Sequence, residues 1–325
     1  MLELKYPLFD GEKVWEGAAV TVDNGIITSV TARDSSECCE GFLMPGLIDA
    51  HTHMGSNAHV DAMLRNGITA TCDVSAFREL VESSKQLEII SSAGMAMGMV
   101  MNSKGFVERA VANGARYIKV LLFNRLSIGK TALRSIVKVA HEKGLKVAVH
   151  ATEVATVHQA VDAGADILLH IPMKEKFPVE LAQTIAAKGI AVAPTLVMME
   201  TFAHSGRGGY EVRHYANAEN AVKLLHDYGV SILAATDANT GSFAPAVAYG
   251  SSVHREMELL VKAGLSSVEV LTSATSKNAD AFGLKAGRIA PGQPATMVLV
   301  EGRADKKITD ITKIKQIWIH GEPIL

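Results

Sequence analysis

The feature that most constrains the fold is a repeated phrase: an Ala-rich helical segment, then a glycine, then a short apolar run. The apolar runs cover residues 68–74, 95–101, 116–122, 146–150, 166–170, 190–194 and 230–237. A glycine suits the left-handed position that closes a helix before the chain turns into a strand. Strands that alternate with helices in this way indicate a parallel sheet with right-handed crossovers.

Counting 47–54 as the first strand gives eight βα units, which predict an α/β fold containing a closed (β/α)8 TIM barrel. Such a barrel needs roughly 250 residues, and the chain has 325. An open doubly wound sheet is the alternative architecture. The absence of a Gly-rich dinucleotide turn after the first strand counts against its usual nucleotide-binding form.

The two ends of the chain have a different pattern from the middle. Residues 14–27 and 295–300 are β-rich with Gly and Asp turns, and 317–323 have the pattern of a final hairpin. Neither end is long enough to form a domain alone. We expect 1–45 and 286–325 to combine into one small β-sandwich domain, and 46–285 to form the barrel.

Composition narrows the class of protein. Hydrophobic residues make up 48% of the chain and charged residues 20%, which allows a large core and excludes global disorder. The net charge of −2 provides no basic field for nucleic acid or an acidic membrane. The three cysteines are too few for a disulfide framework, and the N-terminus lacks a secretory pattern. We expect a cytoplasmic protein with a small-molecule substrate and no nucleic-acid or membrane partner.

Potential metal ligands stand at the ends of several of these runs. His51 and His53 lie two apart on one strand, so both imidazoles can reach one ion. His150 and His170 end strands that are one βα unit apart, and Asp237 ends the last strand. Each residue also has an ordinary alternative role, as a buried histidine bonded to backbone or as a carboxylate that caps a helix. Together they indicate a metallohydrolase whose chemistry lies at the carboxyl ends of the strands.

Two further polar residues occur within these runs. Lys119 lies in an apolar strand, where a protonated ammonium would repel a metal ion. It must therefore be neutral, modified or a bystander, and its spacing alone favours a bystander. Asp49 precedes His51 by two residues and could orient a ligand from beneath or make ordinary strand-end hydrogen bonds.

The motifs resemble those of the amidohydrolase superfamily. The phrase PGLIDAHTH at 45–53 is similar to its signature, and the downstream order of Lys, His, His and Asp resembles its two-metal members. GARYIKV at 114–120 and HREMELL at 254–260 resemble the branch of imidazolonepropionase-like and Xaa-Pro dipeptidase-like proteins. Further matches are AGL at 263–265, AT at 274–275 and GRIAPG at 287–292, so the resemblance covers nearly the whole chain.

The resemblance implies a role for each residue. His51, His53 and Asp237 would bind the more buried of two divalent metal ions, and His150 and His170 the more exposed one. Lys119 would be carboxylated and would bridge the ions, as would the hydroxide that attacks the substrate. Asp237 would be the catalytic residue that takes the proton from the hydroxide and delivers it to the leaving amine.

The implied reaction is hydrolysis of a C–N amide bond in a dipeptide, an N-acyl amino acid or a cyclic amide. A lactone, a carbamate or a phosphotriester is the alternative substrate, and a binding protein that has lost catalysis is the non-enzymatic alternative. Four imidazoles with carboxylates favour Zn, but Mn, Co, Ni and Fe fit similar sites. The resemblance also implies pairing into homo-oligomers.

Substrate contacts are predicted after the seventh strand. The segment 204–214 contains Arg207, Tyr210 and His214 among flexible glycines, a mixture suited to binding a substrate carboxylate. A mobile, solvated loop is the alternative interpretation. His254 begins the helix after the eighth strand and is expected to face the pocket. The short chain, and the lack of a Gly-containing turn in 171–176, make the substrate less certain than the metal site.

Overall fold

The computed structural model describes residues 1–74, 76, 78–123 and 127–324, which form an α/β fold with two parallel sheets and one mixed sheet. The larger parallel sheet has the order β12-β11-β10-β9-β8. Its strands are β8 (Met95–Ala96), β9 (Ile118–Leu122), β10 (Val147–Ala151), β11 (Ile167–Leu169) and β12 (Ala191–Ala193). The smaller has the order β5-β6-β7, with β5 (Leu47–Thr52), β6 (Ile68–Asp73) and β7 (Glu88–Ser91).

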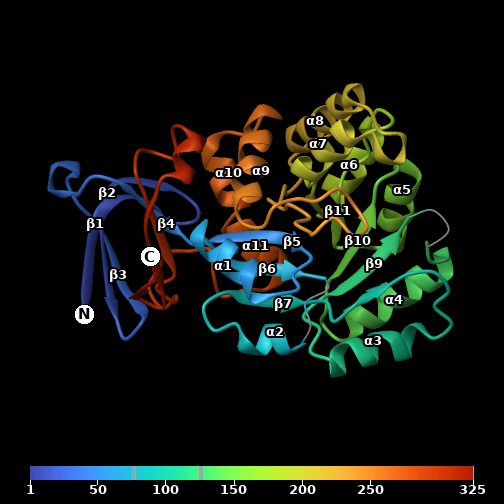
Figure 1. The fold of residues 1–325 in the computed structure, drawn as a ribbon, viewed down its shortest axis with the longest axis horizontal. Helices are drawn as coiled ribbons and strands as arrows, with labels where there is room; N and C mark the ends of the chain where they lie inside the picture. Colours follow the sequence, from blue (N-terminus) through green and yellow to red (C-terminus); the bar gives the residue numbers. More distant parts are fainter. Residues whose placement is uncertain (75, 77, 124–126, 325) are drawn as a thin grey trace.

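Helices pack against these sheets, and several that follow one another along the chain lie side by side (Figure 1). The first six are α1 (Asn57–Arg65), α2 (Arg78–Ser83), α3 (Ser103–Ala112), α4 (Lys130–Glu142), α5 (Val154–Ala163) and α6 (Val179–Ala187). The others are α7 (Leu196–Ser205), α8 (Val212–Asp227), α9 (Ser251–Lys262), α10 (Ser267–Ser273) and α11 (Ser276–Phe282). None of the helices in the described part of the chain is long and apolar enough to cross a membrane.

The strands bury both of their faces, as expected for parallel strands covered by helices. Alternate residues enter two different clusters: Val147 and Val149 pack with the outer helices, whereas Ala148 packs with Ile48 of β5, Leu169 of β11 and their inner neighbours. Successive side chains of a strand point to opposite faces. The inner cluster therefore joins side chains from strands of both parallel sheets.

Residues 231–238 lie between the two parallel sheets. The Leu233 amide donates to the Val192 carbonyl of β12 at 2.8 Å, and the Asp237 amide donates to the His51 carbonyl of β5 at 2.9 Å. The predicted strand over 230–237 forms only isolated bridges to its neighbours, and Asp237 has a left-handed φ of 59°. Its backbone hydrogen bonds nevertheless connect β12 with β5.

The third predicted strand, 95–101, is largely wrong. The strand beside β6 is β7, at 88–91, and only Met95–Ala96 of the predicted run forms a strand, which pairs with β9. Gly98 has a left-handed φ of 63°, which breaks the extended run, and Met99 and Met101 are exposed. The methionines of this run led to the prediction of a buried strand, because the hydrophobic pattern alone does not distinguish a buried strand from an exposed apolar loop.

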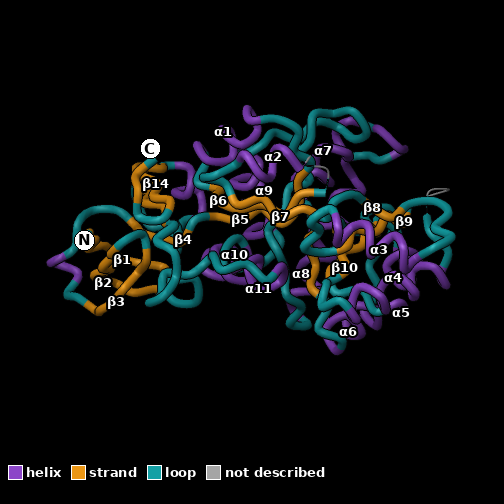
Figure 2. The backbone as a smooth tube through the Cα atoms, turned by 90° about the horizontal axis from the view of Figure 1, so that it is seen from below, coloured by secondary structure: helices purple, strands orange, loops and turns teal. Residues whose placement is uncertain are grey.

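The two chain ends meet in one seven-stranded mixed sheet of the order β15-β14-β13-β4-β1-β2-β3 (Figure 2). Its strands are β1 (Leu2–Phe9), β2 (Val14–Asp23), β3 (Ile26–Ala32), β4 (Phe42–Pro45), β13 (Met297–Val300), β14 (Ile314–Ile319) and β15 (Glu322–Pro323). The Ile27 amide donates to the Gln293 carbonyl at 2.9 Å, which brings the edge strand β3 back beside the segment before β13. The sheet thus curls around its own apolar core. The β-sandwich domain expected from the two chain ends stays a prediction.

Asn278 of α11 holds β5 beside the 231–238 segment. Its buried side-chain amide donates to the Ile48 carbonyl at 2.7 Å and to the Ala234 carbonyl at 2.8 Å. Neither carbonyl can reach water at this depth, because Ile48 and Ala234 are fully buried. Loss of the amide would leave both acceptors without this donor.

We expect Asn278→Ala to lower the free energy of unfolding by about 1–3 kcal/mol through the loss of the bond to the Ile48 carbonyl. The Ala234 carbonyl keeps a second donor, the Ala50 amide at 3.1 Å. The measurement is urea denaturation followed by circular dichroism. Asn113→Ala, at the exposed C-terminal end of α3, is the matched control and should leave the midpoint unchanged. Equal midpoints for both variants would show that the Asn278 amide does not hold the two segments together.

Candidate metal centre

The predicted ligands come from the carboxyl ends of adjacent strands. Lys119 and His150 lie within β9 and β10, and His170 directly follows β11. Ala148 of β10 pairs with Lys119, and Leu169 of β11 pairs with His150, so the three side chains stand close together at one edge of the sheet. The 231–238 segment brings Asp237 to the end of β5, beside His51.

The functional groups converge. Asp237 Oδ1 is 3.0 Å from His53 Nε2 and 3.4 Å from His51 Nε2, and Lys119 Nζ is 3.5 Å from His51 Nε2. The His170 ring lies 5.2 Å from the His51 ring and 4.3 Å from the His150 ring, measured between centroids. Ligand atoms of His51, His170 and Asp237 all lie within 4.8 Å of one another. The structure therefore brings all six predicted metal-site residues together.

The residues present fit a divalent metal ion. Within the described part of the chain, His51 Nδ1 and His150 Nε2 are buried and have no hydrogen-bond partner. Burial, followed by the nearby Lys119 or imidazoles, lowers the pKa of His51, His150 and His170, so these rings are neutral. Neutral imidazole is the form that binds a metal. Nitrogen ligands with one carboxylate are a donor set that suits zinc and related transition metals.

Lys119 is the unusual member of the centre. Its side chain is 2% exposed, and burial lowers the pKa of its amine to about 7, although Asp237 acts in the opposite direction. A large fraction of the amine is therefore neutral near pH 7, and a neutral amine does not repel a cation. The geometry places Lys119 inside the centre, whereas spacing in the sequence favoured a bystander.

Asp49 joins the two segments that carry His51 and Asp237. One carboxylate oxygen accepts hydrogen bonds from the His51 amide at 3.1 Å and the Thr236 amide at 3.0 Å. The other accepts from the Thr236 hydroxyl at 2.6 Å. Burial raises the pKa of Asp49 to about 7, and the three hydrogen bonds act in the opposite direction. Asp49 therefore orients the backbone of both segments and touches no imidazole ring through these bonds.

A second buried carboxylate, Asp73 at the end of β6, supports the turn that carries His53. It accepts hydrogen bonds from the Thr52 hydroxyl at 2.7 Å and the Met54 amide at 2.6 Å, on either side of His53. The Tyr249 hydroxyl donates to the His53 carbonyl. These bonds hold the His53 backbone so that its ring meets Asp237.

The predicted substrate residues of the 204–214 segment have different surroundings. Tyr210 is partly buried, and the Lys174 ammonium lies 4.5 Å from its ring centroid. Arg207 is exposed in the short 3-10 helix η3 (Arg207–Gly209). His214 Nδ1 accepts from the Glu211 amide at 2.9 Å and caps the first turn of α8. The Tyr210 side chain also bonds to Thr152, which lies two residues after His150 in the chain.

The prediction that His254 faces the pocket is wrong. Its Nε2 is 2.9 Å from the Asn66 carbonyl oxygen at the end of α1, and its side chain is buried there. The apolar face of α9 carries His254 into this contact. Sequence position at the start of a helix could not reveal on which face the imidazole lies.

Three residues near the centre were missed from the sequence. Thr195 Oγ1 is 2.8 Å from His170 Nδ1, and Glu256 lies buried behind Thr195. Phe123 follows β9 and lies edge-on to His150, with 5.8 Å between ring centroids. Thr195 and Phe123 stand just after strands, which is the signal that identified the histidines. Glu256 interrupts the apolar face of α9 and could have been found as a misplaced charge.

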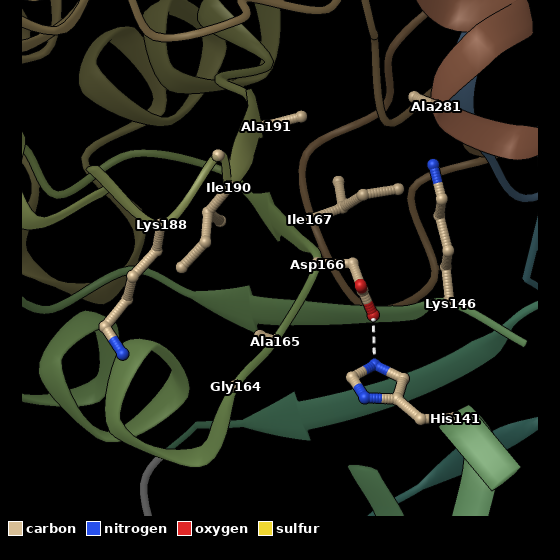
Figure 3. Close-up of a pocket in the computed structure, with 11 residues that line it drawn as sticks. His141, Lys146, Gly164, Ala165, Asp166, Ile167, Lys188, Ile190, Ala191 and Ala281 are labelled. Atoms are coloured by element: carbon tan, nitrogen blue, oxygen red, sulfur yellow. Dashed lines mark hydrogen bonds and ion pairs between the residues drawn. The ribbon is translucent and has the colours of Figure 1, made fainter. Parts of the chain in front are cut away.

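A separate cavity of about 380 Å³ lies at the other end of the strands (Figure 3). Its walls include Lys146 and Asp166, which precede β10 and β11, and Asp166 Oδ2 is 2.8 Å from His141 Nε2. Chemistry in a βα barrel sits at the carboxyl ends of the strands. The cavity is therefore distinct from the metal centre.

Comparisons with known proteins agree with this geometry. A model of the amidohydrolase family matches residues 42–324. An uncharacterized protein of Mycobacterium tuberculosis (strain ATCC 25618 / H37Rv) is 23% identical in an alignment 297 positions long that covers 78% of each chain. A solved Xaa-Pro dipeptidase with bound methionine in the active site has a TM-score of 0.83 at 18% identity, covering 99% of this chain and 98% of that one. A prolidase complexed with N-methylphosphonate-L-proline has a TM-score of 0.80 at 19% identity, covering 99% and 98%.

We expect Zn²⁺ to raise the thermal unfolding midpoint of the purified protein, because an ion that binds only the folded state stabilises it. His170→Ala should reduce this rise, since it removes one imidazole from the centre. His204→Ala, on an exposed part of α7, is the matched control and should respond like the original protein. The measurement is differential scanning calorimetry with and without a chelator. An equal rise in both variants would place the ion elsewhere.

Proposed function

The chain belongs to the amidohydrolase family, and on that premise we propose that it is a metal-dependent hydrolase that cleaves a C–N amide bond of a small substrate. Dipeptides, N-acyl amino acids and cyclic amides are the substrate classes. The observation that carries the proposal is the convergence of the imidazoles, Lys119 and Asp237 at the carboxyl ends of the strands. This is where a βα barrel performs its chemistry.

We also propose that the two parallel sheets and the 231–238 segment form a closed (β/α)8 barrel over 46–285. The inner apolar cluster supports this proposal, because it joins β5, β6, β10, β11, β12 and residues 233–235. Hydrogen bonds on both sides of 231–238 support it as well. The curled sheet of 1–45 and 286–325 would then be a separate domain beside the barrel.

Two divalent ions, with Zn as our first choice, would be held by the six residues of the centre. His51, His53 and Asp237 would hold one ion, and His150 and His170 the other. When bound, paired ions lower the pKa of water and polarise the scissile carbonyl. The supporting observations are the neutral imidazoles and the two buried ring nitrogens without a protein partner among the described residues.

Asp237 would act as the general base and acid of the reaction. Its side chain is 11% exposed, and Oδ1 is the oxygen that contacts His51 and His53, so the other oxygen could take the proton. It would accept a proton from the attacking water and deliver it to the nitrogen of the leaving amine. Proton delivery prevents the amine from leaving as an unstable anion.

Lys119 would carry a carboxyl group. A neutral amine attacks CO₂ to form a new N–C bond and releases one proton, and the product is an anionic carbamate. This reaction replaces a repelled cation by a ligand with two oxygens. The lowered pKa of Lys119 supports it, because an amine that is partly neutral near pH 7 can react.

The rim of the site suggests a substrate with both apolar and anionic parts. The Phe123 ring is 40% exposed and lies against His150, which provides an apolar wall beside the centre. Lys174 donates to the Gly208 carbonyl at 2.8 Å and keeps a cation beside Tyr210. A small amide with an apolar side chain and a free carboxylate matches this combination.

We expect the Zn- or Mn-loaded protein to release amine from some members of a library of dipeptides and N-acyl amino acids. Turnover should stop with a chelator, because the ions supply the activated water. The measurement is amine release with a fluorogenic reagent, and a protein lacking the Asp237 carboxylate, Asp237→Asn, is the negative control. If the protein holds two metals and hydrolyses no amide, lactones, carbamates or phosphotriesters become the favoured substrates.

We expect Lys119→Ala to lose metal and activity, because the bridging carboxylate would be absent. Short carboxylic acids such as acetate should restore part of both by filling the space left by the side chain. Metal content and turnover are measured together with and without acetate. Lys130→Ala, at the exposed start of α4, is the control. Full activity in Lys119→Ala would remove Lys119 from the centre.

A further inference from the structure

Glu256 is a buried carboxylate in the middle of α9. Its carboxylate oxygens accept hydrogen bonds from the Leu196 amide at 3.0 Å and the Val197 amide at 2.7 Å. These are the first two residues of α7, whose amides have no partners within the helix. Burial raises the pKa of Glu256 to about 8, while the two amide hydrogen bonds act in the opposite direction, so the contact rests on these two bonds and not on a full negative charge. Glu256 therefore caps α7 from a different helix.

The residue before this capped turn contacts a metal-site imidazole. Thr195 has a left-handed φ of 50°, which is costly for a β-branched residue, and its Oγ1 is 2.8 Å from His170 Nδ1. His170 itself has a left-handed φ of 70°. Two strained residues in contact keep this conformation only if the surrounding structure holds them. The carboxylate of Glu256 holds the peptide units directly after Thr195.

We propose that Glu256 is a positioning residue for His170. By fixing the Leu196 and Val197 amides it holds Thr195 in its left-handed conformation, and the Thr195 hydroxyl then accepts from His170 Nδ1. This leaves the unprotonated Nε2 of His170 directed at the metal. The inference rests on the metal centre of the proposed function, and it assigns a role to a residue that is in contact with no ligand.

The neighbouring residue Arg255 provides a control that distinguishes the positioning role of Glu256 from a general role in packing α9 against α7. Arg255 also connects α9 with α7, through bonds of 2.7 and 3.1 Å to the Glu200 carboxylate. Glu200 lies one turn into α7 and does not touch its amino end. Removing the Glu200 charge therefore weakens the contact between α7 and α9 without touching the Thr195 turn.

The test measures Zn²⁺ affinity by competition with a chromophoric chelator for the full chain and its variants. We expect Glu256→Gln to weaken binding by about 10- to 100-fold, as loss of a group that supports a metal ligand does. Glutamine has the same size as glutamate, but its NH₂ group is a donor and cannot accept a hydrogen bond from one of the two backbone amides. Glu200→Gln is the matched control, and it should keep the original affinity. Unchanged affinity in Glu256→Gln would overturn the proposal.

A double-mutant cycle with Thr195 gives a second measurement, independent of activity. Thr195→Val removes the hydroxyl that meets His170, while Thr195→Ser keeps it. We expect the losses of Thr195→Val and Glu256→Gln to be non-additive, because both act through one contact. Additive losses would overturn the proposal. If Glu256→Gln does not fold, equal Zn²⁺ affinity in Thr195→Val and Thr195→Ser would overturn it.

These results are separable from the proposed reaction. If the original protein binds Zn²⁺ and hydrolyses no amide while Glu256→Gln loses affinity, the reaction is wrong and the positioning role stands. If the original protein hydrolyses amides and Glu256→Gln binds Zn²⁺ equally well, the reaction stands and the positioning role is wrong.

Discussion

The rest of the site depends on the buried carboxylate of Asp49. Parallel strands do not by themselves bring the first and last βα units together, and the last one, 231–238, forms only isolated bridges to its neighbours. Asp49 adds three hydrogen bonds, from the His51 amide and from the Thr236 amide and hydroxyl, to the backbone bonds that join the two segments. Because its partners flank the metal ligands, the carboxylate that joins the two units also sets the distance between His51 and Asp237.

The centre is built from strained backbone. His170, Thr195 and Asp237 all have left-handed φ values, and such residues cost on the order of 1–3 kcal/mol each. His170 and Thr195 follow the short strands β11 and β12, and Asp237 ends a segment that forms only isolated bridges; at each point the chain turns while still presenting a side chain. Hydrogen bonds to the following residues, such as that from Ala238 to the Thr236 hydroxyl at 3.0 Å, offset this cost. A site held by such bonds loses less entropy on binding a ligand than a site whose backbone must first become ordered.

The sequence predicted the part of the site that repeats. A glycine, an apolar run and a strand-end ligand recur along the chain, so the histidines and Asp237 could be placed on one edge of a sheet. Lys119 was assigned to the site only by the family resemblance, because its position in the sequence favoured a bystander. The run at 95–101 failed because exposed methionines have the same hydrophobicity as buried ones. His254 failed because its role depends on the Asn66 carbonyl, 188 residues away in the chain. Contacts of this kind have no local signature.

The electrostatics of the centre favours a bound cation. Three buried imidazoles have lowered pKa values, and the Lys119 amine is partly neutral near pH 7, so the buried nitrogen ligands carry little positive charge. Asp237 places a carboxylate against two of the histidines. A water-filled or empty pocket would leave neutral lone pairs facing one another beside an anion. A divalent cation would bind the nitrogen lone pairs and would also balance the negative charge of Asp237. Burying these polar groups without partners is unfavourable, and a bound cation would remove that cost.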